Sequence, residues 1–225
     1  MHLYVGDVNS KSACVKWITS AMKKFGAIDG LINNAAIAGP GGRLHEIDFA
    51  ELEDTIQTNL VSPIFLCQQI LKIFLKQGRG LVINLSGGGA TQGRPFFSPY
   101  AISKCALVRM TETLALEYPQ LRFYSIAPGR LVTPMTKSIL KINPAKIGAE
   151  YPEMKQRYEE GGDSPLKAAE LALWLFENQP EHLNGRLISA IWDNYRDTPS
   201  YPSQVGWWTL RRIDDQCRKT LSESL

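Results

Sequence analysis

LVINLSGGGATQGRPFFSPYAISKCALVRMTETLALEYPQLRFYSI, residues 81–126, is the stretch of the chain that indicates its fold class. It contains an apolar run at 81–85, a helix-like stretch at 99–118 and a second apolar run at 122–126. A short strand, a long helix and another short strand in succession are typical of a parallel sheet with crossover helices. We therefore predict an α/β fold.

The same alternation extends toward both ends of the chain. Apolar runs at 3–5, 30–32 and 187–191 predict further strands, and helical patterns near 10–25, 49–77 and 166–177 predict helices between them. Glycine and proline mark the breaks, among them Gly78, Gly80 and Pro128. Because such alternation covers both faces of a parallel sheet, we predict one doubly wound domain over residues 1–225.

Composition limits the possible partners. With 44% apolar and 21% charged residues, the 225-residue chain is predicted to bury one core and to be neither disordered nor a membrane protein. A net charge of +3 without a basic stripe argues against nucleic acid binding. We also predict no metal site and, because no export or membrane signal is apparent, a cytoplasmic protein with buried thiols. The four cysteines are Cys14, Cys67, Cys105 and Cys217.

Residues 143–164 are rich in charge, glycine and proline and have no strong periodicity. Two interpretations stay open for this segment. It is either a mobile lid over a site or a surface excursion.

Tyr100 and Lys104 lie four residues apart in a helix-like stretch, so their side chains share one face. A phenol with a pKa near 10 is a poor base at neutral pH, and a neighbouring ammonium favours the phenolate. Such a pair suits proton exchange with an alcohol or a carbonyl. Tyr151 and Lys155 have the same spacing but lie in the charged segment, so we predict that Tyr100 is functional and that Tyr151 is ordinary surface.

Several motifs around this pair, in order, resemble those of the short-chain dehydrogenase/reductase family. They are Asp7-Val8, the NNAA stretch at 33–36, Asn59, the Tyr100 and Lys104 pair, and PGRLVTPM at 128–135. The resemblance covers most of the chain. It implies a Rossmann-like sheet, an NAD or NADP cofactor, a small-molecule alcohol or carbonyl substrate, and a homodimer or homotetramer.

The resemblance also implies residue roles. Tyr100 would be the catalytic acid/base, and Lys104 would lower its pKa and hold the nicotinamide ribose. Asn59 would position a relay water, and Ser86 would orient the substrate. The cofactor-binding set would be Asp7, Val8, Asn34, Ala35, Tyr100, Lys104, Pro128, Gly129 and Thr133.

Two substitutions depart from the family pattern on the substrate side. The family's serine lies thirteen residues before the tyrosine, where this chain has Gly87. A local bulge at the neighbouring glycines would return Ser86 to the site, with Thr91 as a weaker substitute. The last predicted strand is followed by Trp192 and Asp193 instead of the family's Asp-Gly-Gly, which predicts a remodelled substrate wall.

The family also begins with a strand, a glycine-rich phosphate-binding turn, a helix and a second strand, whereas six residues precede Asp7 here. Without the two strands, the run at 3–5 has no neighbour and the strand at 30–32 has an open edge. We therefore expect Met1 to be an internal methionine of a longer chain, a miscalled start or the start of a shortened isoform. The residues that separate NAD from NADP binding lie in the same missing region.

The sequence leaves three functions open. The first is an NAD(P)-dependent oxidoreductase that interconverts a secondary alcohol and a carbonyl. The second is a non-catalytic truncated homologue that acts as an interaction or regulatory protein, or an unstable fragment. The third is a binding module that uses Trp207 and Trp208 for protein contacts.

Overall fold

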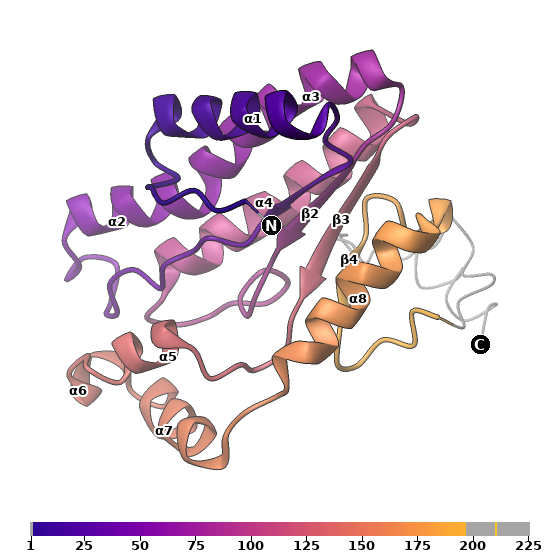
Figure 1. Cartoon of the computed structure of the whole chain (residues 1–225). Helices are drawn as coiled ribbons and strands as arrows, with labels where there is room; N and C mark the ends of the chain where they lie inside the picture. The colour runs from indigo at the N-terminus through magenta and orange to yellow at the C-terminus, as the bar shows by residue number, and fades with distance from the viewer. Residues whose placement is uncertain (1, 197–209, 211–225) are drawn as a thin grey trace, which may run out of the picture.

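The protein is built on a four-stranded parallel sheet, seen in a computed structural model that describes residues 2–196 and 210 (Figure 1). Neighbouring strands pair in the order β1-β2-β3-β4, which is also their order along the chain. The strands are β1 (Gly30–Asn33), β2 (Leu81–Leu85), β3 (Arg122–Ala127) and β4 (Leu187–Ser189).

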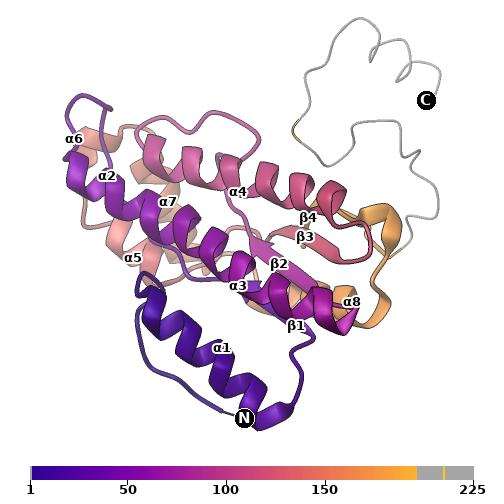
Figure 2. The ribbon, with the colours of Figure 1, turned by 90° about the horizontal axis from the view of Figure 1, so that it is seen from above.

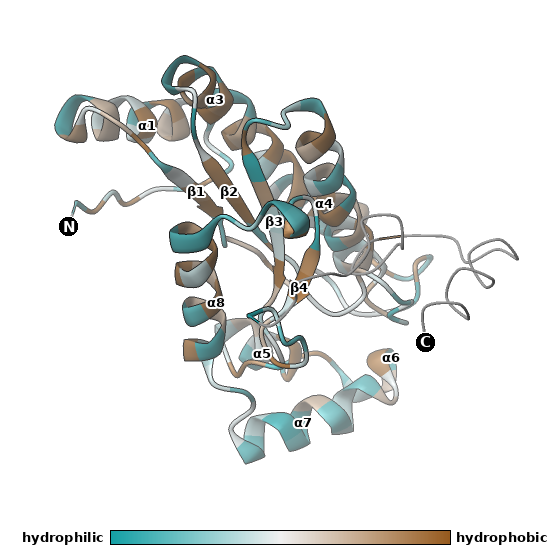
Figure 3. Cartoon of the chain, turned by 90° about the vertical axis from the view of Figure 1, so that its right-hand side faces the viewer, coloured by the Kyte–Doolittle hydropathy of each residue, from teal (hydrophilic) through white to brown (hydrophobic). Residues whose placement is uncertain are grey.

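Helices connect the strands and cover both faces of the sheet. Figures 2 and 3 show α3 and α4 on one face, α1 beside α3, and α8 on the opposite face. This arrangement confirms the predicted α/β fold. The helices are α1 (Lys11–Phe25), α2 (Phe49–Ile56), α3 (Ser62–Gln77), α4 (Ser98–Glu117), α5 (Pro134–Ile139), α6 (Pro144–Ile147), α7 (Glu150–Glu160) and α8 (Pro165–Asn178), with a π turn at Gln57–Val61 and a 3-10 turn at Glu181–Leu183.

Alternating strand residues form two apolar layers, because successive side chains of a strand point to opposite faces. Leu81 and Ile83 of β2 pack with Leu171 of α8. Val82 points the other way and packs with Phe74 of α3. The central strand β2 is therefore buried on both sides, as its continuous apolar sequence predicts.

A row of polar side chains crosses the sheet near the carboxyl ends of the strands. Asn33, Asn84 and Ser125 are register partners on β1, β2 and β3. Asn33 donates to Asn84, Asn84 donates to Thr111 of α4, and Ser125 also donates to Thr111, each at 2.8 Å. Buried polar groups need such partners, so this row fixes the register and the placement of α4.

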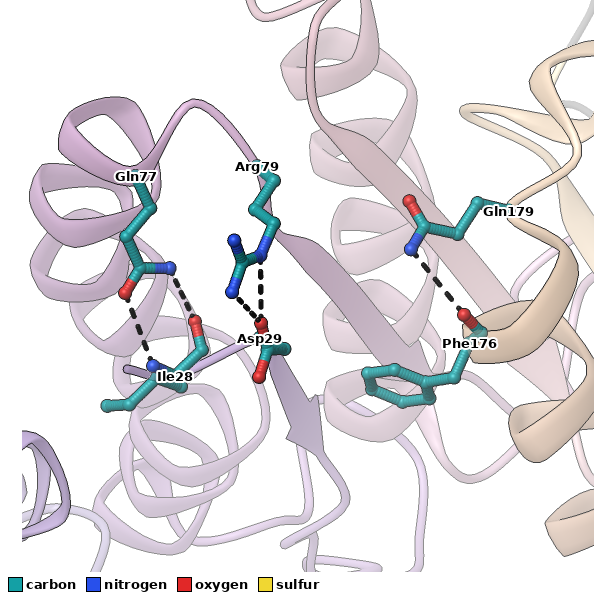
Figure 4. Close-up of polar contacts among 6 residues, drawn as sticks. All are labelled: Ile28, Asp29, Gln77, Arg79, Phe176 and Gln179. Atoms are coloured by element: carbon teal, nitrogen blue, oxygen red, sulfur yellow. Dashed lines mark hydrogen bonds and ion pairs between the residues drawn. The ribbon is translucent and has the colours of Figure 1, made fainter. Parts of the chain in front are cut away.

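Side chains from the end of α3 and the turn after it hold the amino end of β1 (Figure 4). The Gln77 amide accepts from the Ile28 N–H at 3.3 Å and donates to its carbonyl at 2.8 Å, in the manner of a strand neighbour. Arg79 pairs with Asp29 at 3.0 Å. Phe176 of α8 packs so close to Gly30 that a β-carbon there would meet its ring at 2.1 Å, so this position requires glycine.

Three sequence predictions of secondary structure are wrong. Residues 3–5 form no strand, and the Leu3 and Val5 side chains are exposed. Residues 143–164 are not irregular, because they contain α6 and α7. Strand β4 ends at Ser189, two residues earlier than predicted. The predicted roles of Trp207 and Trp208 lie outside the described residues.

The open edge predicted for the strand at 30–32 is present in the described part of the chain, where β1 pairs with β2 alone. Ile32 on this strand is 47% exposed. An unpaired strand edge leaves backbone donors and acceptors free for another strand.

The helical run from Phe49 to Gln77 is interrupted by the π turn, which the sequence did not reveal. By length and composition it is the one helix among the described residues that could cross a membrane. The core helix of a soluble protein passes the same test, and Ile70, Leu71 and Phe74 of this run belong to the core. The length and hydropathy of this helical run therefore do not distinguish a membrane-spanning helix from a core helix.

Candidate active site

Tyr100 and Lys104 occupy the first two turns of α4, directly beyond the end of β2. Pro99 sits in the first turn of this helix, where its missing N–H costs no helical hydrogen bond. Both side chains are buried, with Tyr100 7% and Lys104 3% exposed. Lys104 Nζ donates to the Leu85 carbonyl at 2.8 Å and lies 5.7 Å from the centre of the Tyr100 ring. The structure therefore brings the predicted pair together.

The pKa of Tyr100 is shifted in the direction opposite to the sequence prediction. Burial raises the pKa of Tyr100, and the cation that opposes this rise is Arg94. Burial also lowers the pKa of Lys104 to about 8, because a buried ammonium loses its hydration. Desolvation thus outweighs the cation that lowers the Tyr100 pKa, and that cation is Arg94 instead of the predicted Lys104.

Gly87 lies against the Tyr100 hydroxyl. A β-carbon placed on Gly87 would be 2.4 Å from the phenolic oxygen, which is closer than real β-carbons come to other atoms. Gly88, the next residue, has open space at the same position. The absence of a side chain at position 87 therefore has a local physical reason, namely the space that the phenol needs.

Ser86 is buried at the end of β2, and its N–H donates to the Ile126 carbonyl at 2.8 Å. Its Oγ has no hydrogen-bond partner among the described residues. Thr91, the weaker candidate, is exposed. A buried hydroxyl without a partner costs free energy, so Ser86 is the better placed of the two to bind a substrate oxygen.

Asn59 sits in the π turn and is fully buried. Its Oδ1 accepts from the Ile37 N–H at 2.8 Å, and its Nδ2 donates to the Ile37 carbonyl and to Ser103 Oγ. Ser103 in turn donates to the Tyr100 carbonyl at 2.7 Å. With both amide protons used, the Asn59 side chain can only accept from a further group, and it ties the loop after β1 to the helix of Tyr100.

A small hollow of about 50 Å³ lies at the carboxyl end of β1, and three predicted cofactor-binding residues line it. The walls are Val8, Ile32, Asn33, Asn34, Ala35, Thr58, Ser62, Pro63 and Leu66. Asn9 donates to Thr58 and accepts from Ser62, which holds the preceding Val8 at the rim. Asp7, also predicted to bind the cofactor, is exposed and accepts from the Asn9 N–H.

The remaining predicted cofactor residues follow β3. Gly129 has φ +94, a conformation that favours glycine, and it opens the loop that leads to α5. Arg130 N–H donates to Asp163 at 2.6 Å, and Asp163 N–H donates back to the Arg130 carbonyl. Pro128 and Thr133 flank this loop. The predicted residues thus gather at the carboxyl ends of β1, β2 and β3, where open parallel sheets bind ligands.

Helix α7 lies in the segment at 143–164, for which a mobile lid and a surface excursion were both predicted, and it packs on the apolar cluster that contains Tyr100. Arg94 donates from Nε and Nη2 to the Glu150 carboxylate at 2.9 to 3.3 Å. Its guanidinium carbon lies 4.6 Å from the Phe97 ring centre and 5.4 Å from that of Tyr100. Tyr151 is half-buried against the apolar cluster that contains Tyr100, so the prediction that it is ordinary surface is wrong.

Comparison with known proteins points to one family. The sequence profile of the short chain dehydrogenase family matches residues 1–143. Levodione reductase of Leifsonia aquatica is 31% identical over 192 residues, 82% of this chain and 70% of that protein. The 2-(R)-hydroxypropyl-CoM dehydrogenase of Xanthobacter autotrophicus is 35% identical over 137 residues, 59% of this chain and 52% of that protein.

Solved structures agree with the sequence matches. The KRED1-Pglu enzyme has a TM-score of 0.76 and 27% identity, covering 82% of this chain and 78% of its own. NAD+-bound xylitol dehydrogenase shares the fold with a TM-score of 0.73 at 23% identity, covering 83% of this chain and 76% of its own. The chain thus spans about half to three quarters of the proteins that it resembles.

Proposed function

The chain belongs to the short-chain dehydrogenase family, and on this basis we propose that it takes part in NAD(P)-dependent interconversion of a secondary alcohol and a carbonyl compound. The observation that carries the proposal is the placement of Tyr100 and Lys104. Both lie at the carboxyl end of β2, with Lys104 anchored to the Leu85 carbonyl. The phenolic oxygen lies against Gly87, next to the buried and unpartnered Ser86 hydroxyl in the described part of the chain.

Tyr100 moves the proton in this proposal. Because burial raises its pKa, the phenol keeps its proton at neutral pH and donates it to the carbonyl oxygen during reduction. In the oxidation direction the same oxygen accepts the proton of the alcohol. Lys104 carries a positive charge below about pH 8 and favours the phenolate that forms after each donation. The bound dinucleotide would supply or accept the hydride.

The residues present fit such a cofactor at the carboxyl ends of the strands. Asn34, Ala35 and Val8 line the hollow beside β1. Pro128, Gly129 and Thr133 lie at the end of β3, and Tyr100 and Lys104 at the end of β2. We propose these residues together with Asp7 as the binding surface, and we leave NAD and NADP as equal alternatives.

Three further features belong to the same proposal. The substrate is a small molecule, the protein acts in the cytoplasm without nucleic acid or membrane partners, and it assembles as a homodimer or homotetramer.

Replacement of Tyr100 by phenylalanine tests the role of the phenol. Tyr100→Phe keeps the ring and removes the transferable proton, so the rate of carbonyl reduction with NADH or NADPH should fall by about a hundredfold or more. Tyr151→Phe is the matched control, since it removes a hydroxyl from the same apolar cluster. Equal loss in the two variants would contradict the assignment.

A non-catalytic role is the second candidate. It is favoured by Gly87, because this position provides no hydroxyl to orient a substrate. The two candidates differ in cofactor binding, which fluorescence titration with NADH and NADPH measures directly. Saturable binding that Asn34→Leu weakens supports the enzyme, whereas absence of binding supports the non-catalytic role.

A further inference from the structure

Helix α7 presents one face to the apolar cluster that holds Tyr100. Met154 on this face is buried and belongs to that cluster. Glu150, one turn earlier, pairs with Arg94. Arg157 follows Met154 by three residues, so its side chain leaves the helix on the same face. The turn after α7 is held to the loop after β3 by the two hydrogen bonds between Arg130 and Asp163.

Arg157 lacks an acceptor that matches its charge. Its Nε is buried and has no hydrogen-bond partner among the described residues. Its Nη1 contacts only the sulfur of Met154, at 3.9 Å, and a thioether is a weak acceptor. A charged donor that is buried without a partner is more costly than a neutral one. The face of α7 near Tyr100 is therefore short of one strong acceptor.

Among the described residues Arg157 forms no ion pair, although two carboxylates lie near it. Burial, Arg130 and Arg94 all lower its pKa, while Glu150 and Glu153 raise it. Glu150 is already bound by two nitrogens of Arg94, and Glu153 is exposed. The surroundings thus favour the entry of a negative group at Arg157.

We propose that Arg157 binds a carboxylate of the substrate and that the protein acts on oxo acids and the corresponding hydroxy acids. A guanidinium presents a planar fork of donors that matches a carboxylate in two-pronged geometry. With its carboxylate on α7, such a substrate would extend toward the phenol of Tyr100. This proposal rests on the proposed function for the reaction, but not for the binding of the acid.

Isothermal titration calorimetry of the 225-residue chain without cofactor tests the proposal independently of catalysis. The probes are 2-oxobutanoate and 3-oxobutanoate, each compared with its methyl ester. The variants are Arg157→Met, which keeps much of the stem, and Arg157→Lys, which keeps the charge. Lys155→Met is the control, because Lys155 lies on the exposed side of the same helix, 3.8 Å from Glu159. A thermal melt of each variant checks that it is folded.

The proposal predicts that at least one acid binds the wild-type chain and Lys155→Met about tenfold tighter than its ester. Arg157→Met should abolish this preference, Arg157→Lys should keep part of it, and rising ionic strength should reduce it. Equal binding of acid and ester, binding of neither, or an unchanged preference in Arg157→Met overturns the proposal. If Arg157 instead holds a dinucleotide phosphate, Arg157→Met will weaken NADPH binding and leave the preference unchanged, which also overturns it.

A preference for the acid in a chain that fails to reduce either probe with NADH or NADPH would separate the two proposals. Binding by Arg157 would then stand, and the oxidoreductase function would fall.

Discussion

The phenolic oxygen of Tyr100 occupies space that is open because Gly87 has no side chain. Gly87 provides the space, because a β-carbon there would stand 2.4 Å from that oxygen. The Tyr100 hydroxyl and the glycine are therefore coupled, and the effect of a change at one should depend on the residue at the other.

Gly87→Ala should lower the free energy of unfolding by about 1–3 kcal/mol, the usual cost of inserting a methyl group into a filled space. Gly88→Ala is the control, since nothing lies within 4 Å of its β-carbon position. In a Tyr100→Phe background the cost of Gly87→Ala should shrink, because the phenolic oxygen is gone. Urea unfolding of the four chains measures the coupling, and equal costs in both backgrounds would argue against the contact.

The burial of Lys104 makes the free energy of unfolding depend on pH. Its pKa is about 8 in the folded chain and 10.5 in the reference state, so the unfolded chain binds more protons between these values. The contribution of Lys104 to stability therefore rises with pH across this window, whereas Lys104→Met has no such group. The free energy of unfolding of the wild type relative to Lys104→Met should grow by up to about 3 kcal/mol from pH 7 to pH 10.

Urea unfolding of both proteins at pH 7 and pH 10 is the measurement. A difference that does not change with pH would show that the Lys104 ammonium keeps its hydration in the folded chain.

Local spacing made the pair predictable, because residues four apart on a helix always share a face. The environment of the pair was not predictable in the same way. The burial that raises the Tyr100 pKa and the approach of Gly87 both depend on how the loop at 86–97 folds over the helix. Contacts of this kind cannot be recognised from the spacing of residues along the sequence.

At the scale of elements, the strands and helices that carry the site follow the apolar pattern closely. The run at 81–85 matches β2 residue for residue. The helix α7 within 143–164 was not predicted, because it is strongly polar and Met154 is its one fully buried residue, so its sequence has few apolar positions. The π turn at Asn59 was not predicted, because an apolar helical pattern continues through it.

The ion pair between Arg94 and Glu150 connects α7 to the loop before α4, and 56 residues separate the partners. Their side chains are 15% and 23% exposed. Arg94→Met should lower the free energy of unfolding by about 2 kcal/mol or more, because it leaves a largely buried carboxylate without its cation.

Arg79→Met is the comparison for this prediction. Arg79 and Asp29 form an ion pair of similar length at 67% and 68% exposure, so its loss should cost less than about 1 kcal/mol. Thermal or urea unfolding of the two variants compares the pairs, and equal costs would contradict the coupling of α7 to the site.

At the scale of the whole molecule, the parallel sheet explains why distant segments meet. The carboxyl ends of β1, β2 and β3 bring Asn34, Ser86 and Gly129 to the same edge of the sheet. This gathering follows from topology alone and was predictable from the alternation of strands and helices. The orientation of α7 across that edge was not, because it depends on contacts with Arg94, Phe97 and Arg130.

In the proposed function, Tyr100 exchanges a proton with the substrate oxygen. The most direct test of this exchange is the rate of carbonyl reduction by the wild type and Tyr100→Phe from pH 6 to pH 8, with dinucleotide binding measured in parallel. The account predicts a wild-type rate that varies little over this range, and a loss of about a hundredfold or more in Tyr100→Phe at every pH with dinucleotide affinity retained. A Tyr100→Phe chain that reduces the carbonyl at the wild-type rate would contradict the account.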